Sequence, residues 1–435
     1  MSIWRRFSRL IGAPCIAKSP EGICRHTTIH VLIVGAGVGG LSLAQSLRRQ
    51  NISFEIFERD THADARFQGW AIAMHSIVDD LVAAFPPDLP DLRGSTNHLQ
   101  PLDLPAQLSM YMQGREGRWG FQDSDDFPFI RAERRRLRDW LRTNIPVQWG
   151  KRVLQIEQDD QGVSVHFEGG GSAKGDILVG ADGVNSVVRE HLINRPATDV
   201  LNVVPLATVV GELELSGDAF KRQLALGHSY MLIRPDLGFI GFAGLHYVHL
   251  DGLSAKYYWN YMETDHEIGK TDHWLRKASQ EEKQRHVLGS IQGLSPEFRE
   301  IFEITRAENI RRETHVWRDL ELDGVGLPAG RVILMGDAAH AMTPFRGEGG
   351  YHTLVDTLVL GKVLGGMHRE GTFRDATAVE QTVAAYNSSM LERAGRAVRD
   401  SRNLHADAQR FGPDGKPLVL KIVSLPDTEI KLGRE

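Results

Sequence analysis

Cysteine is nearly absent from this sequence of 435 residues, which contains only Cys15 and Cys24. A disulfide framework or a multi-cysteine metal centre needs more cysteines than this, so both kinds of site are excluded. No metal site is predicted. Such sparing use of cysteine fits a reducing compartment, and we expect a cytoplasmic protein.

Long hydrophobic runs and an excess of one charge are also missing. No stretch approaches the roughly 18 apolar residues that a membrane-spanning helix needs, so we expect no transmembrane segment. The 51 Lys and Arg residues against 56 Asp and Glu residues give a net charge of −5, which provides no basic field to attract nucleic acid. What remains is the composition of a soluble globular protein, over a length typical of two or three domains.

The first 27 residues form a basic leader, in which no acidic residue precedes Glu21. Residues 4–11 also place apolar side chains on one helical face, as transit peptides and membrane-surface helices do. Two interpretations stay open. The leader has no structural role and the protein is cytoplasmic, or it directs the chain to mitochondria or holds it weakly on a membrane surface.

A βαβ unit follows this leader. Residues 29–34 form a short apolar run typical of a buried parallel strand, and apolar residues then recur at helical spacing up to residue 49. Between them lies GAGVGG, in which Gly35 permits a tight turn, Gly37 lets a pyrophosphate approach the helix N-terminus, and Gly40 allows close helix packing. Glu58 ends the next strand, where it can accept hydrogen bonds from a ribose. The unit therefore predicts a dinucleotide site.

The rest of the chain predicts an α/β fold with two kinds of sheet. Residues 130–143 resemble a helix with a charged face, and alternating apolar and aromatic residues over 200–262 predict an antiparallel sheet. We therefore expect a discontinuous Rossmann-type dinucleotide-binding domain, a second substrate domain built on the antiparallel sheet, and C-terminal helices. The expected boundaries are 1–27 for the leader, 28–76, 130–198 and 326–405 for the first domain, 77–129 and 199–325 for the second, and 406–435 for a tail.

Two later segments carry a family resemblance that the glycine fingerprint alone does not. Residues 180–189, GADGVNSVVR, and 336–350, GDAAHAMTPFRGEGG, resemble the second and third signatures of the single-component (group A) flavin monooxygenases. This is the family of para-hydroxybenzoate and salicylate hydroxylases, and the resemblance is closest to fungal members of secondary metabolism. With the first fingerprint it spans residues 29 to about 400.

The resemblance implies FAD as cofactor and a role for individual residues. Glu58 would hold the adenosine ribose, Arg131 would contact the cofactor, and Ala71 would lie beside it by its main chain. Asp337 would bind ribityl or ribose hydroxyls, while Asp182 and Arg189 belong to a segment associated with both FAD and NADPH. The reactive edge of the flavin would be lined by Pro344, Gly347, Gly349 and Gly350. A helix that begins near Gly350 independently supports this, because its N-terminus would stabilise negative charge on reduced flavin.

The implied activity is that of a monooxygenase. NADPH or NADH would reduce the flavin, O₂ would form a C4a-hydroperoxide, and one oxygen would pass to an aromatic or polyketide-like small molecule by hydroxylation or epoxidation. Two alternatives stay open: a flavin-dependent oxidase or reductase, and a flavin-binding protein without turnover. Neither the choice of nicotinamide cofactor nor the oligomeric state follows from the sequence.

The sequence also departs from the family pattern at the third signature. Tyr351 and Val359 stand where relatives commonly have Asn, whereas Asp356 matches. These departures put the pose of the flavin in question more than its binding.

Several side chains are candidates for contact with the substrate. Tyr230 is the predicted catalytic residue, because a phenol in the substrate sheet could orient or deprotonate a substrate; core packing is the competing interpretation for it and for Arg234, Tyr257 and Tyr258. For His75 a buried structural role is favoured over a substrate contact. The remaining arginines of the basic cluster are interpreted as a solvated helix face, with NADPH phosphates as the alternative: Arg134, Arg135, Arg136, Arg138 and Arg142.

Overall fold

The computed structural model describes residues 28–322, 324–402, 410–411, 417–418 and 423–425. The basic leader, including the proposed surface contact of residues 4–11, lies outside the described residues, as does most of the tail. No helix in the described part of the chain is long and apolar enough to cross a membrane.

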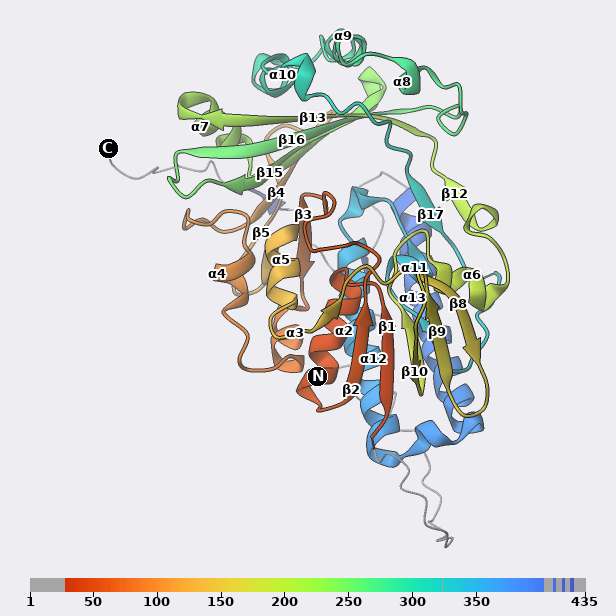
Figure 1. Ribbon diagram of the computed structural model, residues 1–435. Helices are drawn as coiled ribbons and strands as arrows, with labels where there is room; N and C mark the ends of the chain where they lie inside the picture. Colours follow the sequence, from red (N-terminus) through yellow and green to blue (C-terminus); the bar gives the residue numbers. More distant parts are fainter. Residues whose placement is uncertain (1–27, 323, 403–409, 412–416, 419–422, 426–435) are drawn as a thin grey trace, which may run out of the picture.

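Two large sheets organise the molecule (Figure 1). The first has five parallel strands in the order β18-β11-β1-β2-β7. Its strands are β1 (His30–Val34), β2 (Ser53–Phe57), β7 (Val147–Gln148), β11 (Ile177–Gly180) and β18 (Val332–Leu334). Their carboxyl ends point toward the second sheet (Figure 1). In α/β proteins ligands bind at this edge, so the arrangement places a site between the two sheets.

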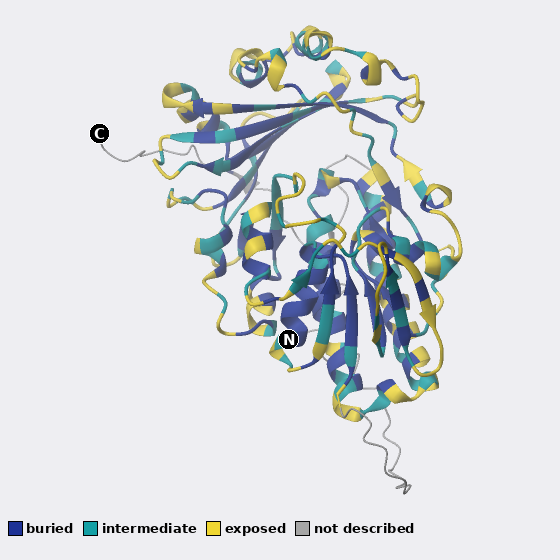
Figure 2. Cartoon of the chain, viewed as in Figure 1, coloured by how far each residue is buried: buried dark blue, intermediate teal, exposed yellow. Residues whose placement is uncertain are grey.

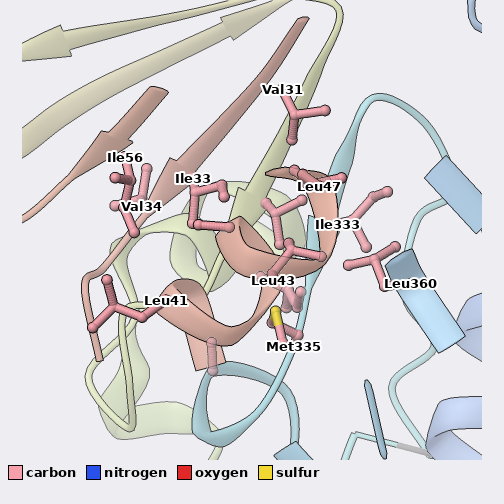
Figure 3. Packing of buried hydrophobic residues seen from close by; sticks show 14 of the residues in the cluster. Val31, Ile33, Val34, Leu41, Leu43, Leu47, Ile56, Ile333, Met335 and Leu360 are labelled. Atoms are coloured by element: carbon pink, nitrogen blue, oxygen red, sulfur yellow. The ribbon is translucent and has the colours of Figure 1, made fainter. Parts of the chain in front are cut away.

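The helices α2 (Val38–Arg49) and α12 (Gly349–Glu370) pack together beside the parallel sheet. Leu41, Leu43 and Leu47 of α2 are fully buried in this core (Figure 3). Glycines let the two helices approach closely, because a Cβ at Gly361 would lie 2.2 Å from the hydroxyl of Ser46. Because helices also cover the parallel sheet, its strands β1, β11 and β18 are buried and are apolar and β-branched rather than alternating.

The second sheet has seven strands in the order β13-β16-β15-β14-β4-β5-β21. Its strands are β13 (Leu206–Ser216), β16 (Ser254–Thr264), β15 (Phe239–Val248), β14 (Ser229–Arg234), β4 (Gln107–Met112), β5 (Trp119–Gln122) and β21 (Val423–Ser424). All neighbours are antiparallel except β14 and β4, which are parallel. The expected antiparallel sheet is thus confirmed over residues 206–264, and β4 and β5 extend it into a mixed sheet.

Helices cover one face of this second sheet, the face away from the parallel strands (Figures 1 and 2). They are α7 (Gly217–Leu226), α8 (Trp274–Lys277), α9 (Gln280–Ser290) and α10 (Pro296–Glu303). Trp259 of β16 lies on the covered face, because its indole N–H donates to Thr305 after α10 at 2.8 Å. The opposite face of the sheet, here called the open face, therefore lies toward the carboxyl ends of the parallel strands.

A pair of strands connects the two sheets. β3 (Ala71–His75) pairs antiparallel with β6 (Phe129–Glu133), and α5 (Arg134–Leu141) follows directly. The prediction of one helix over 130–143 is therefore wrong for its first residues, because β6 is held by β3 and the carboxylate of Glu133 caps α5. The remaining longer elements are α3 (Val78–Ala84), α4 (Leu92–Thr96), β8 (Val153–Gln158), β9 (Val163–Phe167), β10 (Ser172–Gly175), α6 (Val187–Ile193), β12 (Leu201–Val203), β17 (Arg318–Leu320), α11 (Asp337–His340) and α13 (Ala376–Arg402).

Candidate functional site

In the glycine loop after β1, a side chain would fit at Gly37 but not at Gly35 or Gly40. A Cβ at Gly35, where φ is +105°, would lie 2.4 Å from the carbonyl oxygen of Ala181, and a Cβ at Gly40 would lie 1.9 Å from the carbonyl oxygen of Gly35. At Gly37, the N-cap of α2, a Cβ would meet nothing within 4 Å. The loop therefore leaves space in front of the N–H groups of α2, where a helix attracts anions.

Glu58 lies against this loop at the end of β2. Its Oε2 accepts a hydrogen bond from the backbone N–H of Ala36 at 2.8 Å, and its Oε1 accepts one from Asp60 at 3.1 Å. The side chain is buried. Each carboxylate oxygen can accept a second hydrogen bond, so Glu58 can hold the loop and still bind ribose hydroxyls.

One arginine of the basic cluster, Arg138, also contacts the glycine loop. Arg138 is buried and donates to the carbonyls of Ala36 at 2.9 Å and Ala63 at 2.7 Å. The interpretation as a solvated helix face is wrong for this residue. The exposed Arg135 fits it, because its guanidinium lies beside Asp64 in water.

Arg134 lies under the loop that precedes β3. A Cβ at Gly69 would touch its guanidinium at 3.1 Å. Burial lowers the pKa of Arg134, against the attraction of the Asp337 carboxylate. Within the described ranges its guanidinium makes no hydrogen bond or ion pair. Arg134 and Arg138 are four residues apart on α5, so the helical period could have grouped them.

Asp182 and Arg189, by contrast, are engaged with their own loop. The Asp182 carboxylate accepts hydrogen bonds from the hydroxyl of Ser186 at 2.5 Å and the N–H of Val187 at 2.8 Å. Burial raises its pKa, against these hydrogen bonds. Arg189 is fully buried and donates to the carbonyls of Ala338 and Val184. The two residues join the turn after β11 to α11, and their contact with a cofactor stays a prediction.

The buried carboxylate of Asp356 stabilises the turn after β18. Gly336 has φ +59°, and its N–H donates to Oδ2 of Asp356 at 2.8 Å. His340 Nε2 lies 2.6 Å from the same oxygen, and Arg393 of α13 donates to the other oxygen. Asp337, the first residue of α11, is exposed at the tip of this turn. The network thus fixes the backbone that presents Asp337.

The loop at residues 344–350 packs against β3. A Cβ at Gly350 would lie 2.5 Å from Ile72 Cγ2, and one at Gly347 would lie 3.8 Å from Ala73. This brings Gly347 and Gly350 beside β3 at the N-terminus of α12. The predicted flavin contacts of Ala71, Pro344, Gly347, Gly349 and Gly350 stay predictions. Three of the seven residues in this loop are glycines, which have no Cβ, so a flat ring can approach its backbone.

Tyr351 does not project from this loop into the gap between the sheets. Its ring is buried and stacks on the imidazole of His75, with ring centroids 4.6 Å apart and an interplanar angle of 11°. His75 is itself buried, in keeping with the favoured structural interpretation. Val359 packs against the hydrophobic core of the parallel sheet.

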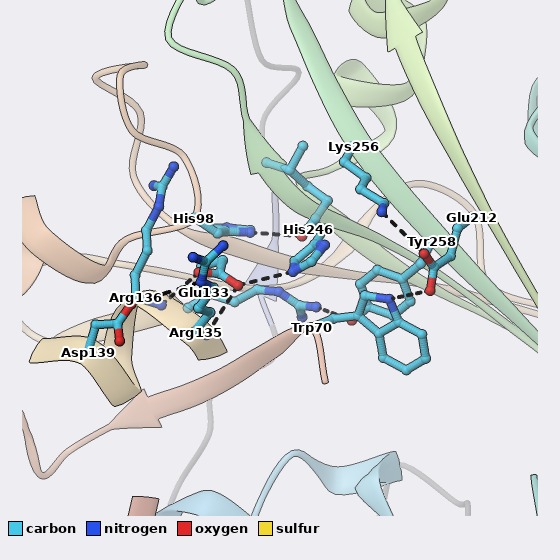
Figure 4. A network of polar contacts seen from close by, with 12 residues as sticks. Trp70, His98, Glu133, Arg135, Arg136, Asp139, Glu212, His246, Lys256 and Tyr258 are labelled. Atoms are coloured by element: carbon cyan, nitrogen blue, oxygen red, sulfur yellow. Dashed lines mark hydrogen bonds and ion pairs between the residues drawn. The ribbon is translucent and has the colours of Figure 1, made fainter. Parts of the chain in front are cut away.

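Arg131 points from β6 to the open face of the second sheet. It donates to the hydroxyl of Tyr258 at 2.6 Å, and Tyr258 stacks on Trp70 with ring centroids 4.3 Å apart (Figure 4). The indole N–H of Trp70 donates to Glu212, which Lys256 also binds. Trp70 and Glu212 are not among the predicted site residues. The cluster closes one side of the space between the sheets, next to Ala71.

Tyr230 lies on the other face of that sheet. It pairs with Ala243, which pairs with Trp259 on the helix-covered side. Its hydroxyl is fully buried and donates to Gln223 of α7 at 2.7 Å, and burial raises its pKa well above the ordinary value. The structure does not bring Tyr230 together with the other predicted residues, and the position of its hydroxyl gives the predicted catalytic role no support.

Comparisons with known proteins bear on the same residues. A profile of a FAD-binding domain matches residues 131–401, and one of an NAD(P)-binding Rossmann-like domain matches residues 33–79. The FAD-dependent monooxygenase ThnD of Trichoderma harzianum is 54% identical over 405 residues, which cover 93% of this chain and 99% of that protein. The FAD-dependent monooxygenase CctM of Talaromyces islandicus is 27% identical and covers 85% and 90% of the two chains.

Solved structures share the fold. The 2,6-dihydroxypyridine-3-hydroxylase of Arthrobacter nicotinovorans superposes with a TM-score of 0.64 at 17% identity, over 92% of this chain and 99% of that one. Klebsiella pneumoniae HpxO, in complex with FAD and uric acid, gives a TM-score of 0.63 at 19% identity, over 86% and 87%. The expected α/β fold with a Rossmann-type domain is confirmed.

Proposed function

Because the chain belongs to the FAD-dependent monooxygenases, we propose that it uses NAD(P)H and O₂ to hydroxylate or epoxidise an aromatic or polyketide-like small molecule. FAD is the cofactor, and the resemblance read from the three sequence motifs is confirmed. The fungal relatives support a place in secondary metabolite biosynthesis. The near absence of cysteine supports a cytoplasmic location.

One observation carries the proposal: the glycine loop, Arg134, Asp337 and the loop at residues 344–350 converge where the parallel strands end. The residues fit FAD, because Gly37 leaves space at the N-terminus of α2 and Arg134 offers a guanidinium that the described residues leave unbonded. Glu58 would hold the ribose, and α2 with Arg134 would bind the pyrophosphate. Asp337 would bind ribityl hydroxyls.

FAD supplies the oxygen chemistry when it is bound, and the protein supplies position and shelter. The loop at residues 344–350 would hold the ring system against β3, and the positive end of α12 would favour negative charge on it. The open face of the second sheet would cover the substrate and exclude water. Arg131, Asp182 and Arg189 remain proposed cofactor contacts.

The division into domains is part of the same proposal. We assign 28–76, 130–198 and 326–405 to the FAD-binding domain, and 77–129 and 199–325 to the substrate domain. Strand membership supports this, because the strands of the parallel sheet fall in the first set of ranges and β4, β5 and β13–β16 fall in the second.

The visible spectrum of the purified protein tests the function. We expect a yellow holoenzyme that is bleached anaerobically by NADPH or NADH, faster in the presence of one member of a panel of phenols and polyenes, and that forms an oxygenated product in air. Rapid bleaching with hydrogen peroxide as the sole product would favour an oxidase or reductase. Bound FAD that neither nicotinamide cofactor reduces, with any compound of the panel, would indicate a flavin-binding protein without turnover.

A further inference from the structure

One histidine of the second sheet contacts the residue that caps α5. β15 pairs with β16 in register up to Leu245 and again from Tyr247, so His246 is an extra, unpaired residue in a β-bulge. A bulge changes the direction of a side chain, and this one directs His246 to Glu133 at the end of β6. The Nε2 of His246 donates to Oε1 of Glu133 at 3.1 Å (Figure 4). Both side chains are buried.

Glu133 fixes the start of α5. Its Oε1 accepts the backbone N–H of Arg135 at 3.2 Å, and its Oε2 accepts that of Arg136 at 2.7 Å, so the carboxylate caps the helix with both oxygens. Burial opposes the ionisation of Glu133, but His246 and these N–H groups hold its pKa below the ordinary value. In the described part of the chain, His246 is the only side chain that bonds to this carboxylate. The orientation of the cap therefore depends on the second sheet.

Arg134, whose guanidinium would bind the pyrophosphate of FAD, is the first residue of the capped helix. Its backbone N–H donates to the carbonyl of Trp70 at 3.0 Å, and its guanidinium lies beside Gly69. A cap fixes the backbone of the first helical turn, and with it the direction in which the first side chain leaves the helix. A group that binds a ligand is effective only when its neighbours hold it in the productive position.

We propose that His246 is a positioning residue for the cofactor. Through the Glu133 carboxylate it holds the first turn of α5, and with it the guanidinium of Arg134, in the orientation that binds the pyrophosphate. The inference rests on the proposed function, and it assigns part of the support of the cofactor site to the second sheet. In this role His246 touches neither cofactor nor substrate. Its loss weakens FAD binding without removing a group that contacts FAD.

Two amide substitutions test the contact between His246 and Glu133. His246→Gln carries an amide N–H about as far along the side chain as Nε2, whereas the amide of His246→Asn ends short of it. We would titrate the full-length protein with FAD and follow the quenching of FAD fluorescence. His246→Gln should bind FAD within about twofold of the wild type. His246→Asn should raise the Kd about tenfold, as the loss of one hydrogen bond to a carboxylate predicts.

A double-mutant cycle separates the positioning of Arg134 from a general loss of structure. In an Arg134→Ala background, His246→Asn should change the Kd by less than about twofold, because the guanidinium that His246 positions is gone. Equal tenfold losses in the two backgrounds would overturn the inference. So would a tenfold loss in His246→Gln, or wild-type affinity in His246→Asn. If His246→Asn does not fold, His246→Leu takes its place in the cycle.

His249→Asn is the matched control. His249 forms the same kind of pair with Glu214 at 2.8 Å, but these two side chains are 39% and 57% exposed. This variant should bind FAD like the wild type, and a loss equal to that of His246→Asn would overturn the inference. Oxygenated product is measured separately at saturating FAD. The expected affinities without any product would overturn the proposed function alone, and product formation with unchanged affinities would overturn this inference alone.

Discussion

His340 Nε2 lies 2.6 Å from Oδ2 of Asp356, the same oxygen that accepts the N–H of Gly336. This fully buried carboxylate also binds Arg393, so it joins α11, α12 and α13 beneath the turn that presents Asp337. Asp356→Asn would leave Arg393 without its counter-charge. We expect a loss of about 3 kcal/mol in the free energy of unfolding, because breaking a buried ion pair costs more than forming it gains.

The same variant should release FAD. Binding should weaken at least about tenfold, measured by quenching of FAD fluorescence, because the Gly336 turn loses its support. Asp125→Asn, at an exposed aspartate, is the control and should change neither quantity. An Asp356→Asn protein that melts and binds FAD like the wild type would contradict the positioning role.

The pH dependence of stability should carry the signature of Asp356. Burial opposes ionisation, but attraction by His340 and Arg393 prevails and lowers the pKa from 3.8 to about 2. A depressed folded-state pKa stabilises the protein above the unfolded value and loses this contribution as the pH falls from about 4 toward 2. Urea unfolding of the apoprotein at a series of pH values should show wild type and Asp356→Asn converging by about 2 kcal/mol over that range. Curves that stay parallel would refute the assignment.

Two glycines of the first loop should respond to alanine in opposite ways. At Gly40 a Cβ has no room beside the carbonyl of Gly35. Gly40→Ala should therefore lower the free energy of unfolding of the apoprotein by about 2 kcal/mol or more, and its melting temperature should fall. At Gly37 the backbone φ is −80° and nothing lies within 4 Å, so Gly37→Ala should leave the apoprotein stable. Its methyl group would occupy the proposed pyrophosphate position, and FAD affinity should fall at least about tenfold. Equal stability loss in both variants would argue against this division.

Neighbouring arginines on α5 provide a second contrast. Arg134→Ala should weaken FAD binding by about tenfold to a hundredfold, since a charge-assisted hydrogen bond to phosphate would be lost. Arg135→Ala should have little effect, because that side chain is exposed and pairs with Asp64 in water. Fluorescence titrations with FAD at two salt concentrations measure both. An effect of Arg135→Ala as large as that of Arg134→Ala would count against a specific phosphate contact.

Tyr230→Phe separates packing from catalysis. The hydroxyl donates to Gln223 on the helix-covered face, so we expect a loss of about 1 kcal/mol in stability and an unchanged kcat for NAD(P)H oxidation with substrate. A large fall in kcat with unchanged stability would instead restore the predicted catalytic role.

More of the proposed cofactor site than of the proposed substrate site could be predicted from the sequence. Gly35 and Gly40 could be assigned because their roles are set by local geometry, a turn and a close contact. The place of Glu58 at the end of a strand was predictable in the same way, and its ribose contact stays a prediction. The helix over 130–143 could not be placed correctly, because β6 exists only through its pairing with β3, a long-range contact. Arg138 of α5 was misjudged for a related reason. Helical spacing shows which of them share a face, but not what that face contacts.

The choice between tyrosines shows the same division. Alternation along residues 254–264 predicts that Tyr257 and Tyr258 point to opposite faces, and cannot tell which face is covered by helices. By itself the sequence determined the Rossmann unit and the two kinds of sheet, because short-range sterics and hydrophobic period dictate them. The flavin cofactor followed from the family resemblance of residues 180–189 and 336–350. Only the tertiary structure decided that Tyr258 faces the cofactor loop while Tyr230 lies in the core, because that depends on how two separately formed sheets pack together.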